Sequence, residues 1–311
     1  MISDYWGNMK LINPEVRIEN TNSCNAKCII CPREKMTRPL MTMNMRYFRE
    51  LVDEVKAMGA KTISIFGYGE PLLDKGLASK IQYCTDKRLQ TFITTNASLL
   101  TTTKSDDILN AGLSHIRFSV HGTYHNYKKV HGLDFMPTLR NIRNFICMND
   151  DKYNHRCKVS MSVIPLHNET VDYIRGFWEP VVDWLEIWKP HNWTDGKDFR
   201  KVKQTKKRKK TCGRPFNGPL QINSDGKVMV CCFDYDAKLT VGNTRTHTLE
   251  EILKGEKFSE IRRKHADGNL KGLICETCDQ LNENDDPLLY SSRDSSRQIG
   301  MTSSTKFKIG E

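Results

Sequence analysis

The stretch VRIENTNSCNAKCIIC, residues 16–31, decides how this chain is interpreted. Apolar and polar residues alternate at its start, which predicts a strand over residues 15–20. Cys24, Cys28 and Cys31 follow on one loop, with the spacing C-x3-C-x2-C. Three thiolates can ligate three irons of a cubane cluster and leave the fourth iron open, whereas such a cluster normally takes four cysteine ligands. The loop therefore predicts a cluster that also binds a small molecule.

Two other interpretations of this loop are free thiols and part of a zinc site. Zinc requires a fourth cysteine or histidine at similarly short range, and the loop contains none. The iron–sulfur interpretation is favoured because further motifs follow it in order along the chain.

The composition narrows the class of protein. The chain has 311 residues, 38% of them apolar, and no run approaches the roughly 18 apolar residues that span a bilayer. The N-terminus lacks the basic-then-apolar layout of a signal peptide. Eleven cysteines without such a signal favour metal ligands in a reducing compartment over disulfides. We therefore expect a cytoplasmic protein that does not contact a membrane.

The net charge of +11 is concentrated in one segment. Residues 200–210 carry eight basic side chains and no acidic one. A solvated linker is the favoured interpretation, and a surface for a phosphate-bearing partner such as nucleic acid is the alternative.

Strand and helix patterns alternate along the first two thirds of the chain. This alternation predicts an α/β fold with a parallel sheet, whose reactive groups gather at the carboxyl ends of the strands. The predicted strands cover residues 15–20, 62–66, 91–95, 115–120, 158–164 and 184–188, and the predicted helices cover 43–58, 76–86, 102–111, 137–149 and 169–178.

Polar and glycine-rich motifs follow these strands. GYGEP, residues 67–71, ends the second strand, and its glycines permit close approach of the backbone to a ligand. A plain turn is the alternative, since glycine-rich segments ending in proline are common turns. Asn96 and Ser119 end the third and fourth strands, and His121 follows the fourth. A structural histidine is favoured over a catalytic one at position 121.

A second group of cysteines lies near the C-terminus. A hairpin with its turn at Asp225–Gly226 ends in Cys231 and Cys232, a helix is expected over 248–265, and a C-x2-C pair follows. Strand alternation places the side chains of Cys231 and Cys232 on opposite faces. Four thiolates from this region can close around one metal site, either a cluster or a zinc ribbon. The remaining cysteines, Cys84, Cys147 and Cys157, are expected to be buried free thiols.

Taken together, the cysteine loop and GYGEP make the chain resemble the radical S-adenosylmethionine (SAM) superfamily. The resemblance implies a partial (β/α)6 TIM-type barrel over residues 15–190. It also implies a [4Fe–4S] cluster on Cys24, Cys28 and Cys31 whose open iron chelates SAM, and reductive cleavage of SAM to a 5′-deoxyadenosyl radical. SAM-binding residues implied by the resemblance are Gly67, Tyr68, Gly69, Glu70, Asn96 and Ser119. The chain departs from the family pattern at Tyr68, between the glycines, at Ile30, where an aromatic residue is usual, and at His121, where an acid is frequent.

The C-terminal cysteines resemble the Twitch domain, a shortened SPASM domain. Its pattern of a cysteine, a spacer and Gly-x4-Cys fits Cys212, Gly226 and Cys231, which favours Cys231 over Cys232 as a ligand. The resemblance implies a small α+β module at 212–283 and one auxiliary [4Fe–4S] cluster. Its ligands would be Cys212, Cys231, Cys275 and Cys278. Residues 1–14 are expected to be an extension, 191–211 a basic linker and 284–311 a disordered tail.

These features predict a radical SAM oxidoreductase, of the dehydrogenase or the peptide-modifying type. The substrate would be a sugar-like small molecule or a peptide, and the reductant a flavodoxin or ferredoxin. The alternatives are an RNA- or nucleotide-modifying radical SAM enzyme and a non-enzymatic electron carrier; nucleic acid is not favoured. His121 and His191 are weak catalytic candidates. Trp188, His191, Asn192 and Trp193 either line the substrate mouth or cover the junction between barrel and module.

Overall fold

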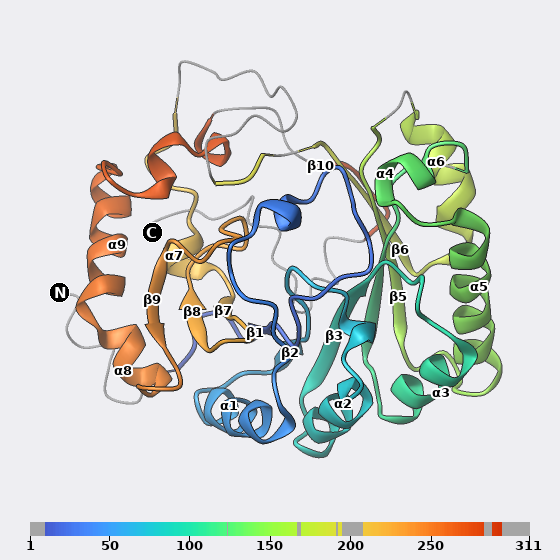
Figure 1. Cartoon of the computed structure of the whole chain (residues 1–311), viewed down its shortest axis with the longest axis horizontal. Coiled ribbons are helices and arrows are strands. Elements are labelled where there is room, and N and C mark those ends of the chain that lie inside the picture. Colours follow the sequence, from blue (N-terminus) through green and yellow to red (C-terminus); the bar gives the residue numbers. More distant parts are fainter. Residues whose placement is uncertain are drawn as a thin grey trace.

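A ten-stranded sheet runs through the whole protein (Figure 1). The structure is a computed structural model that describes residues 10–122, 124–166, 169–190, 192–194, 208–282 and 288–293. Strands β1 to β6 are parallel neighbours in chain order. The sheet curves without closing, so the predicted partial barrel is confirmed. Its strands are β1 (Glu15–Ile18), β2 (Thr62–Ser64), β3 (Gln90–Thr95), β4 (His115–Ser119), β5 (Lys158–Val163) and β6 (Trp184–Trp188).

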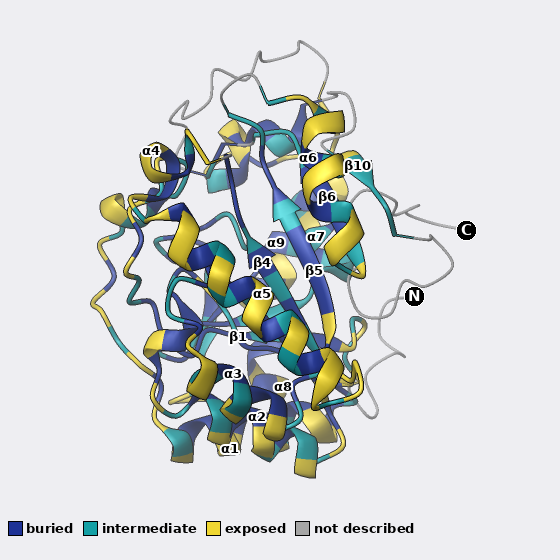
Figure 2. Ribbon diagram, turned by 90° about the vertical axis from the view of Figure 1, so that its right-hand side faces the viewer, coloured by how far each residue is buried: buried dark blue, intermediate teal, exposed yellow. Residues whose placement is uncertain are grey.

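Helices cover the outer face of this sheet, each following a strand (Figure 1). In Figure 2, helix α5 turns its buried residues toward the strands and its exposed residues outward. Phe145 of α5 packs edge-on against Phe118 of β4, for example. The helices are α1 (Met45–Ala57), α2 (Leu77–Asp86), α3 (Thr102–Asn110), α5 (Phe135–Asp151) and α6 (Val171–Trp178), with a short α4 (Tyr127–His131) that the sequence pattern did not predict.

The inner face of the sheet carries polar and aromatic side chains, for example Arg117 over the ring of Phe92, and these alternate along each strand with the apolar side chains of the outer face. Val16 and Ile18 belong to the hydrophobic core, whereas Arg17, between them, pairs with Glu15 at 3.0 Å. In the same way Arg117 of β4 reaches across β5 and pairs with Glu186 of β6 at 2.9 Å. The barrel interior therefore carries charged side chains in balanced pairs.

The C-terminal module continues the sheet from the β1 edge. Strand β7 (Leu220–Ile222) pairs parallel with β1, and β8 (Lys227–Met229) and β9 (Thr240–Asn243) extend it antiparallel. This covers the free hydrogen-bonding groups that an edge strand would expose. The predicted hairpin is confirmed, with Gly226 at φ +90° in its turn, but its second strand ends at Met229, so Cys231 and Cys232 lie beyond it and strand alternation does not apply to them. The module also contains α7 (Arg214–Asn217), α8 (Leu249–Lys254), α9 (Glu256–Asp267), η5 (Ile274–Thr277) and η6 (Asp279–Leu281).

Three sequence-based expectations are wrong. The helix expected over 248–265 is broken at Gly255, whose extended backbone separates α8 from α9, because glycine is a poor helix former. Part of the tail expected to be disordered forms β10 (Leu288–Ser291), which pairs antiparallel with β6 and covers the other edge. Cys147 is exposed on α5, whereas Cys84 and Cys157 are buried as expected. Most of the basic segment 200–210 lies outside the described residues.

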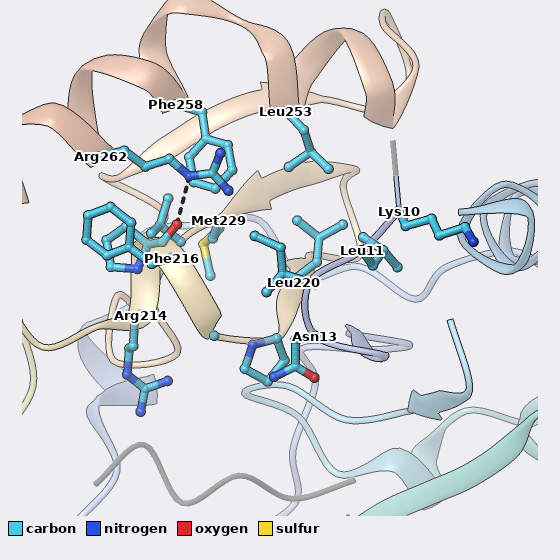
Figure 3. A pocket seen from close by; sticks show the side chains of 15 residues that line it. Lys10, Leu11, Asn13, Arg214, Phe216, Leu220, Met229, Leu253, Phe258 and Arg262 are labelled. Carbon is cyan, nitrogen blue, oxygen red and sulfur yellow. Dashed lines mark hydrogen bonds between the residues drawn. The ribbon is translucent and has the colours of Figure 1, made fainter. Parts of the chain in front are cut away.

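The segment before β1 is docked onto the C-terminal module. Figure 3 shows Leu11 beside Leu220, with Leu253 and Phe258 on the facing helices, around a small pocket. Asn13 donates a hydrogen bond to the carbonyl of Asn217 at 3.0 Å. The N-terminal segment therefore helps to hold barrel and module together. Within the described residues, no helix has the length and apolar character needed to cross a membrane.

Candidate functional site

The cysteine loop leaves β1 and runs to η2 (Pro32–Lys35) at the carboxyl end of the sheet. Its backbone is held by α4, because Lys27 N donates to His131 O at 3.0 Å and Ile29 N to Val130 O at 2.9 Å. Burial raises the pKa of the Cys28 thiol, and the nearby Cys31 and Cys24 thiols raise it further. The three predicted ligands are thus close enough to influence one another's ionisation.

His131 is a neighbour of this loop that the sequence analysis missed. Its Nδ1 lies 3.2 Å from Cys28 Sγ, and its Nε2 accepts a hydrogen bond from His121 N at 2.9 Å. The side chain is 1% exposed, and burial lowers its pKa to about 4. No sequence signal marked it, since it lies on the unpredicted α4.

The GYGEP loop packs directly on the cysteine loop. Glu70 N donates to the carbonyl of Ser23 at 2.8 Å. A Cβ added to Gly69 would collide with the backbone carbonyls of Thr21 and Ser23, and one added to Gly67 would collide with the side chain of Glu19. Both glycines are therefore needed for contact between two loops of the chain itself. That the backbone at Gly67 and Gly69 also approaches bound SAM stays a prediction.

Glu70 joins this loop to the end of β3 by hydrogen bonds. Its buried carboxylate accepts hydrogen bonds from Thr95 Oγ1 at 2.6 Å, Asn96 N at 2.8 Å and Leu72 N at 3.1 Å. Burial raises the pKa of Glu70, and these hydrogen bonds act in the opposite direction. A carboxylate offers about four acceptor positions, so these three hydrogen bonds leave about one for the contact with SAM that the resemblance implies for Glu70.

The other strand-end residues also lie around the cysteine loop. Asn96 Nδ2 donates to Asn25 Oδ1 at 3.1 Å, within that loop. His121 Nδ1 accepts from Ile164 N at 3.1 Å, and its Nε2 lies 3.0 Å from Ser119 Oγ. Both ring nitrogens of His121 are thus engaged between β4 and β5, which favours a structural role over a catalytic one. His191, the other catalytic candidate, lies outside the described residues.

Cysteines of the C-terminal module meet at one cavity. All four predicted ligands of the auxiliary cluster line it, whereas Cys232 does not. Burial, with the neighbouring Cys212 and Cys278 thiols, raises the pKa of Cys275 to about 12. Burial likewise raises the pKa of Cys278 to about 11. The lining cysteines are Cys212, Cys231, Cys275 and Cys278.

Neither cysteine group has the geometry of a single-ion site. Among the described residues, no three histidine, cysteine, aspartate or glutamate side chains converge closely enough to hold one metal ion. A zinc ion would draw its thiolates to roughly 3.8 Å of one another, given Zn–S bonds of about 2.3 Å. A cubane carries each thiolate on a different iron and so spaces them more widely. The four thiolates of the module are a donor set that can ligate either a zinc ion or a cubane cluster.

Two further side chains of the cavity are His265 and Arg214. Burial lowers the pKa of His265 to about 4, so its ring is neutral. The Arg214 guanidinium lies over the ring of Phe233 at 5.0 Å, and although burial acts to lower its pKa, the neighbouring cysteines raise it. In Figure 3 it extends away from the pocket around Leu253 and Phe258. No ion pair joins Arg214 to a carboxylate in the part of the chain that the structure describes, so its charge is available to a cluster.

Aromatic side chains bridge the two cysteine groups. Trp193 Nε1 donates to the carbonyl of Ile30, next to Cys31, at 3.1 Å. The Trp193 ring lies 5.7 Å from the ring of Phe233, whose amide donates to Cys231 Sγ at 3.4 Å. Trp193 therefore lies at the junction of barrel and module, between the two predicted cluster sites.

A parallel connection runs through Tyr68 of the GYGEP loop. Its hydroxyl donates to the carbonyl of Cys232 at 2.6 Å, and its ring lies 5.8 Å from that of Trp193. Its amide donates to Glu19, which forms a buried bidentate pair with Arg38 at 2.9 Å. Glu19 also accepts from Ser224 of the module. The departure from the family pattern at Tyr68 thus links the barrel to the module.

Comparison with known proteins agrees with this geometry. The model of the Radical SAM superfamily matches residues 18–177, about half of the chain, and that of the SPASM iron-sulfur cluster-binding domain matches residues 212–279. The chain belongs to the radical SAM superfamily. Its barrel domain is of the class that binds a [4Fe–4S] cluster and SAM, and its C-terminal domain is of the class that binds auxiliary iron–sulfur clusters.

Individual relatives differ in how much of the chain they match. A SAM-dependent 2-deoxy-scyllo-inosamine dehydrogenase of Niallia circulans is 22% identical over 86% of this chain and 92% of its own length. An uncharacterised protein of Methanocaldococcus jannaschii is 32% identical over 44% of this chain and 46% of its own. The PqqA peptide cyclase of Bradyrhizobium diazoefficiens is 27% identical over 34% of this chain. The chain thus spans about half the length, or less, of some of these relatives.

Solved structures show the same fold. BtrN in complex with AdoMet and 2-DOIA has a TM-score of 0.55 at 18% identity, covering 95% of this chain and 99% of its own. Streptococcus suis SuiB bound to the precursor peptide SuiA has a TM-score of 0.64 at 14% identity, covering 92% of this chain and 76% of its own. At these identities the likeness concerns the fold alone.

Proposed function

We propose that this protein is a radical SAM dehydrogenase that oxidises a polar small molecule bound inside the barrel. The observation that carries the proposal is the bridge between the two cysteine groups, in which Trp193 contacts the loop of Cys31 on one side and the loop of Cys231 on the other. A substrate beside this bridge would lie between a site for SAM and a site for an electron acceptor.

When bound, SAM on its cluster supplies a 5′-deoxyadenosyl radical for hydrogen abstraction, and the auxiliary cluster supplies an electron acceptor. In the proposed net reaction the substrate loses a hydrogen atom, an electron and a proton, and SAM becomes methionine and 5′-deoxyadenosine. Cys24, Cys28 and Cys31 would hold the first cluster, and the lining cysteines Cys212, Cys231, Cys275 and Cys278 the second. We further propose a flavodoxin- or ferredoxin-type reductant and a cytoplasmic location.

The polar barrel interior supports a polar substrate. Arg17 and Glu186 are each already paired with an opposite charge, so the inner face offers hydrogen-bonding groups without a large net charge. Such a wall suits a substrate with hydroxyl or amine groups better than it suits an apolar substrate. An apolar substrate would leave buried polar groups of the wall without hydrogen-bond partners, which is costly. A small molecule is favoured over a peptide because the dehydrogenase relative matches 86% of this chain, against 34% for the peptide cyclase.

The experiment compares substrate classes under strictly anaerobic conditions. Reconstituted protein is reduced and incubated with SAM and with a panel of sugars and aminocyclitols, or with a panel of peptides. We expect a sugar or aminocyclitol to accelerate 5′-deoxyadenosine formation and to lose the mass of two hydrogens. Stimulation by peptides alone would refute the small-molecule assignment.

Two variants separate the steps of this proposal. Replacing Cys24, Cys28 and Cys31 by Ala should abolish 5′-deoxyadenosine formation. Replacing Cys275 and Cys278 by Ala should leave some SAM cleavage but no oxidised product. Full product formation in the second variant would show that the auxiliary site accepts no electron from the substrate.

A further inference from the structure

We propose that His131 is a positioning residue that donates its Nδ1–H to the sulfur of Cys28 and raises the reduction potential of the SAM-binding cluster. The inference rests on the cluster that the family binds at Cys24, Cys28 and Cys31, and not on the proposed substrate. His131 Nδ1 lies 3.2 Å from Cys28 Sγ.

The hydrogen-bond partners of the ring fix its tautomer. His131 Nε2 accepts from the backbone amide of His121 at 2.9 Å, and an amide nitrogen can only donate. In a neutral imidazole the other nitrogen then carries the hydrogen. The Nδ1–H therefore faces Cys28 Sγ, which as a cluster ligand is a thiolate and can only accept.

Packing holds the ring in this place. The His131 ring stacks on Tyr127 with a centroid separation of 4.4 Å and on His121 at 5.3 Å. Its backbone carbonyl accepts from Lys27 N of the cysteine loop at 3.0 Å. Loop and ring are thus held together, and the donor is excluded from water. Hydrogen bonds to cluster sulfurs are among the factors that set cluster potentials.

An independent observation assigns the same role to His265 at the auxiliary site. His265 is 1% exposed and lines the cavity formed by the four cysteines. Its Nδ1 lies 2.9 Å from Thr211 Oγ1, and with the ring hydrogen on Nε2 the Thr211 hydroxyl would donate to Nδ1 while accepting from Gly213 N at 3.1 Å. Its Nε2 is buried and has no hydrogen-bond partner within the described residues.

We therefore infer that the unpartnered Nε2–H of His265 faces a sulfur of the auxiliary cluster. An unsatisfied buried donor is costly, and a cluster sulfur in this cavity would satisfy it. Each cluster site would then have its own buried histidine donor, on α4 for the barrel and on α9 for the module.

The test measures both cluster potentials by anaerobic redox titration with EPR detection in the reconstituted protein without substrate. SAM perturbs the signal of only the first cluster, which separates the two. His131→Leu should lower the equilibrium constant for reduction of the first cluster about tenfold, which is about 59 mV for one electron. His265→Leu should do the same for the second cluster only.

Each variant serves as the control for the other, and conservative variants test for rescue. His131→Asn keeps a donor at the δ position and His265→Gln one at the ε position, so each should restore most of the potential. Unchanged potentials in the leucine variants with full iron content would overturn the proposal. An equal shift of both reduction potentials in either leucine variant would also overturn it. Loss of four irons in His265→Leu would overturn it too, because His265 would then be a ligand. Because no substrate is used, failure here is distinct from failure of the dehydrogenase proposal.

Discussion

The indole nitrogen of Trp193 donates a hydrogen bond to the carbonyl of Ile30 across a sequence separation of 163 residues. This bond joins the segment after the sixth barrel strand to the cysteine loop after the first. The ring of Trp193 simultaneously contacts Phe233 of the module. One side chain thus connects three parts of the chain that contribute to the two predicted cluster sites.

Removing this side chain should loosen the junction between barrel and module. Trp193→Ala should lower the free energy of unfolding by about 1–3 kcal/mol, because a half-buried aromatic ring and its hydrogen bond are lost. Trp193→Phe, which keeps the ring contacts, should lose only about 1 kcal/mol. Anaerobic urea unfolding of the reconstituted variants measures the difference. Equal stability of parent and alanine variant would show that the bridge contributes nothing to the junction.

Iron content tests the two cluster sites together. Anaerobically reconstituted protein should hold about eight irons, in two cubanes of four. Alanine at Cys24, Cys28 and Cys31 should remove one cubane and all SAM cleavage, and alanine at the four cysteines of the module should remove the other. Iron, sulfide and zinc analysis provides the measurement. One zinc with about four irons would contradict the auxiliary cluster and leave the SAM-binding one intact.

Adjacent cysteines at the end of the module's hairpin should behave differently. Cys231 lines the cavity with the other three predicted ligands, whereas Cys232 does not. Cys231→Ala should therefore lose the auxiliary cluster and Cys232→Ala should keep it. Iron counts on the two purified variants decide between them. If the Cys231→Ala protein retains the iron content of the parent, the ligand has been wrongly assigned.

The Glu19–Arg38 pair should be important for stability. Both side chains are 3% exposed, and Arg38→Leu would leave the carboxylate of Glu19 buried without its counter-charge. Loss of one partner of a buried pair costs about 3–5 kcal/mol. The matched control is Arg46→Leu, since Arg46 forms an exposed pair with Glu50 and should contribute at most about 0.5 kcal/mol. Urea denaturation compares the two, and similar losses in both variants would contradict the prediction.

His115 should make stability depend on pH. Burial holds the pKa of His115 well below its usual value of 6.5, between the rings of Phe92 and Trp184. The unfolded chain takes up a proton below about pH 6.5 and the folded chain does not. The contribution of neutral His115 to the free energy of unfolding is therefore fully present above pH 6.5. It is lost as the pH falls below 6.5, by up to about 1.4 kcal/mol per pH unit.

The His115→Phe variant tests this sign. Its free energy of unfolding should fall less steeply than that of the parent between pH 6.5 and 5.5. The exposed His247→Phe variant controls for loss of a histidine as such. Parallel pH profiles for parent and His115→Phe would show that His115 does not carry the effect.

The sequence by itself determined the parts that depend on local pattern. Strand alternation and helix periodicity predicted the six barrel strands and the five helices that cover them, because burial on one face imposes those periods. The spacing of Cys24, Cys28 and Cys31 placed three predicted ligands on one short loop. The Gly226-x4-Cys231 spacing likewise selected the cysteine that the structure places in the cavity.

Only the tertiary structure decided which distant groups meet. The glycines of GYGEP indicated a ligand site from their type alone. The packing shows that Gly69 admits the carbonyls of Thr21 and Ser23, and that Gly67 admits the side chain of Glu19. His131 and His265 carry no local pattern, so their positions beside cysteines depend on how α4 and α9 pack. Residues 288–291 are a short apolar stretch within a polar tail, and so short a segment gains strand structure only from the sheet edge that it covers.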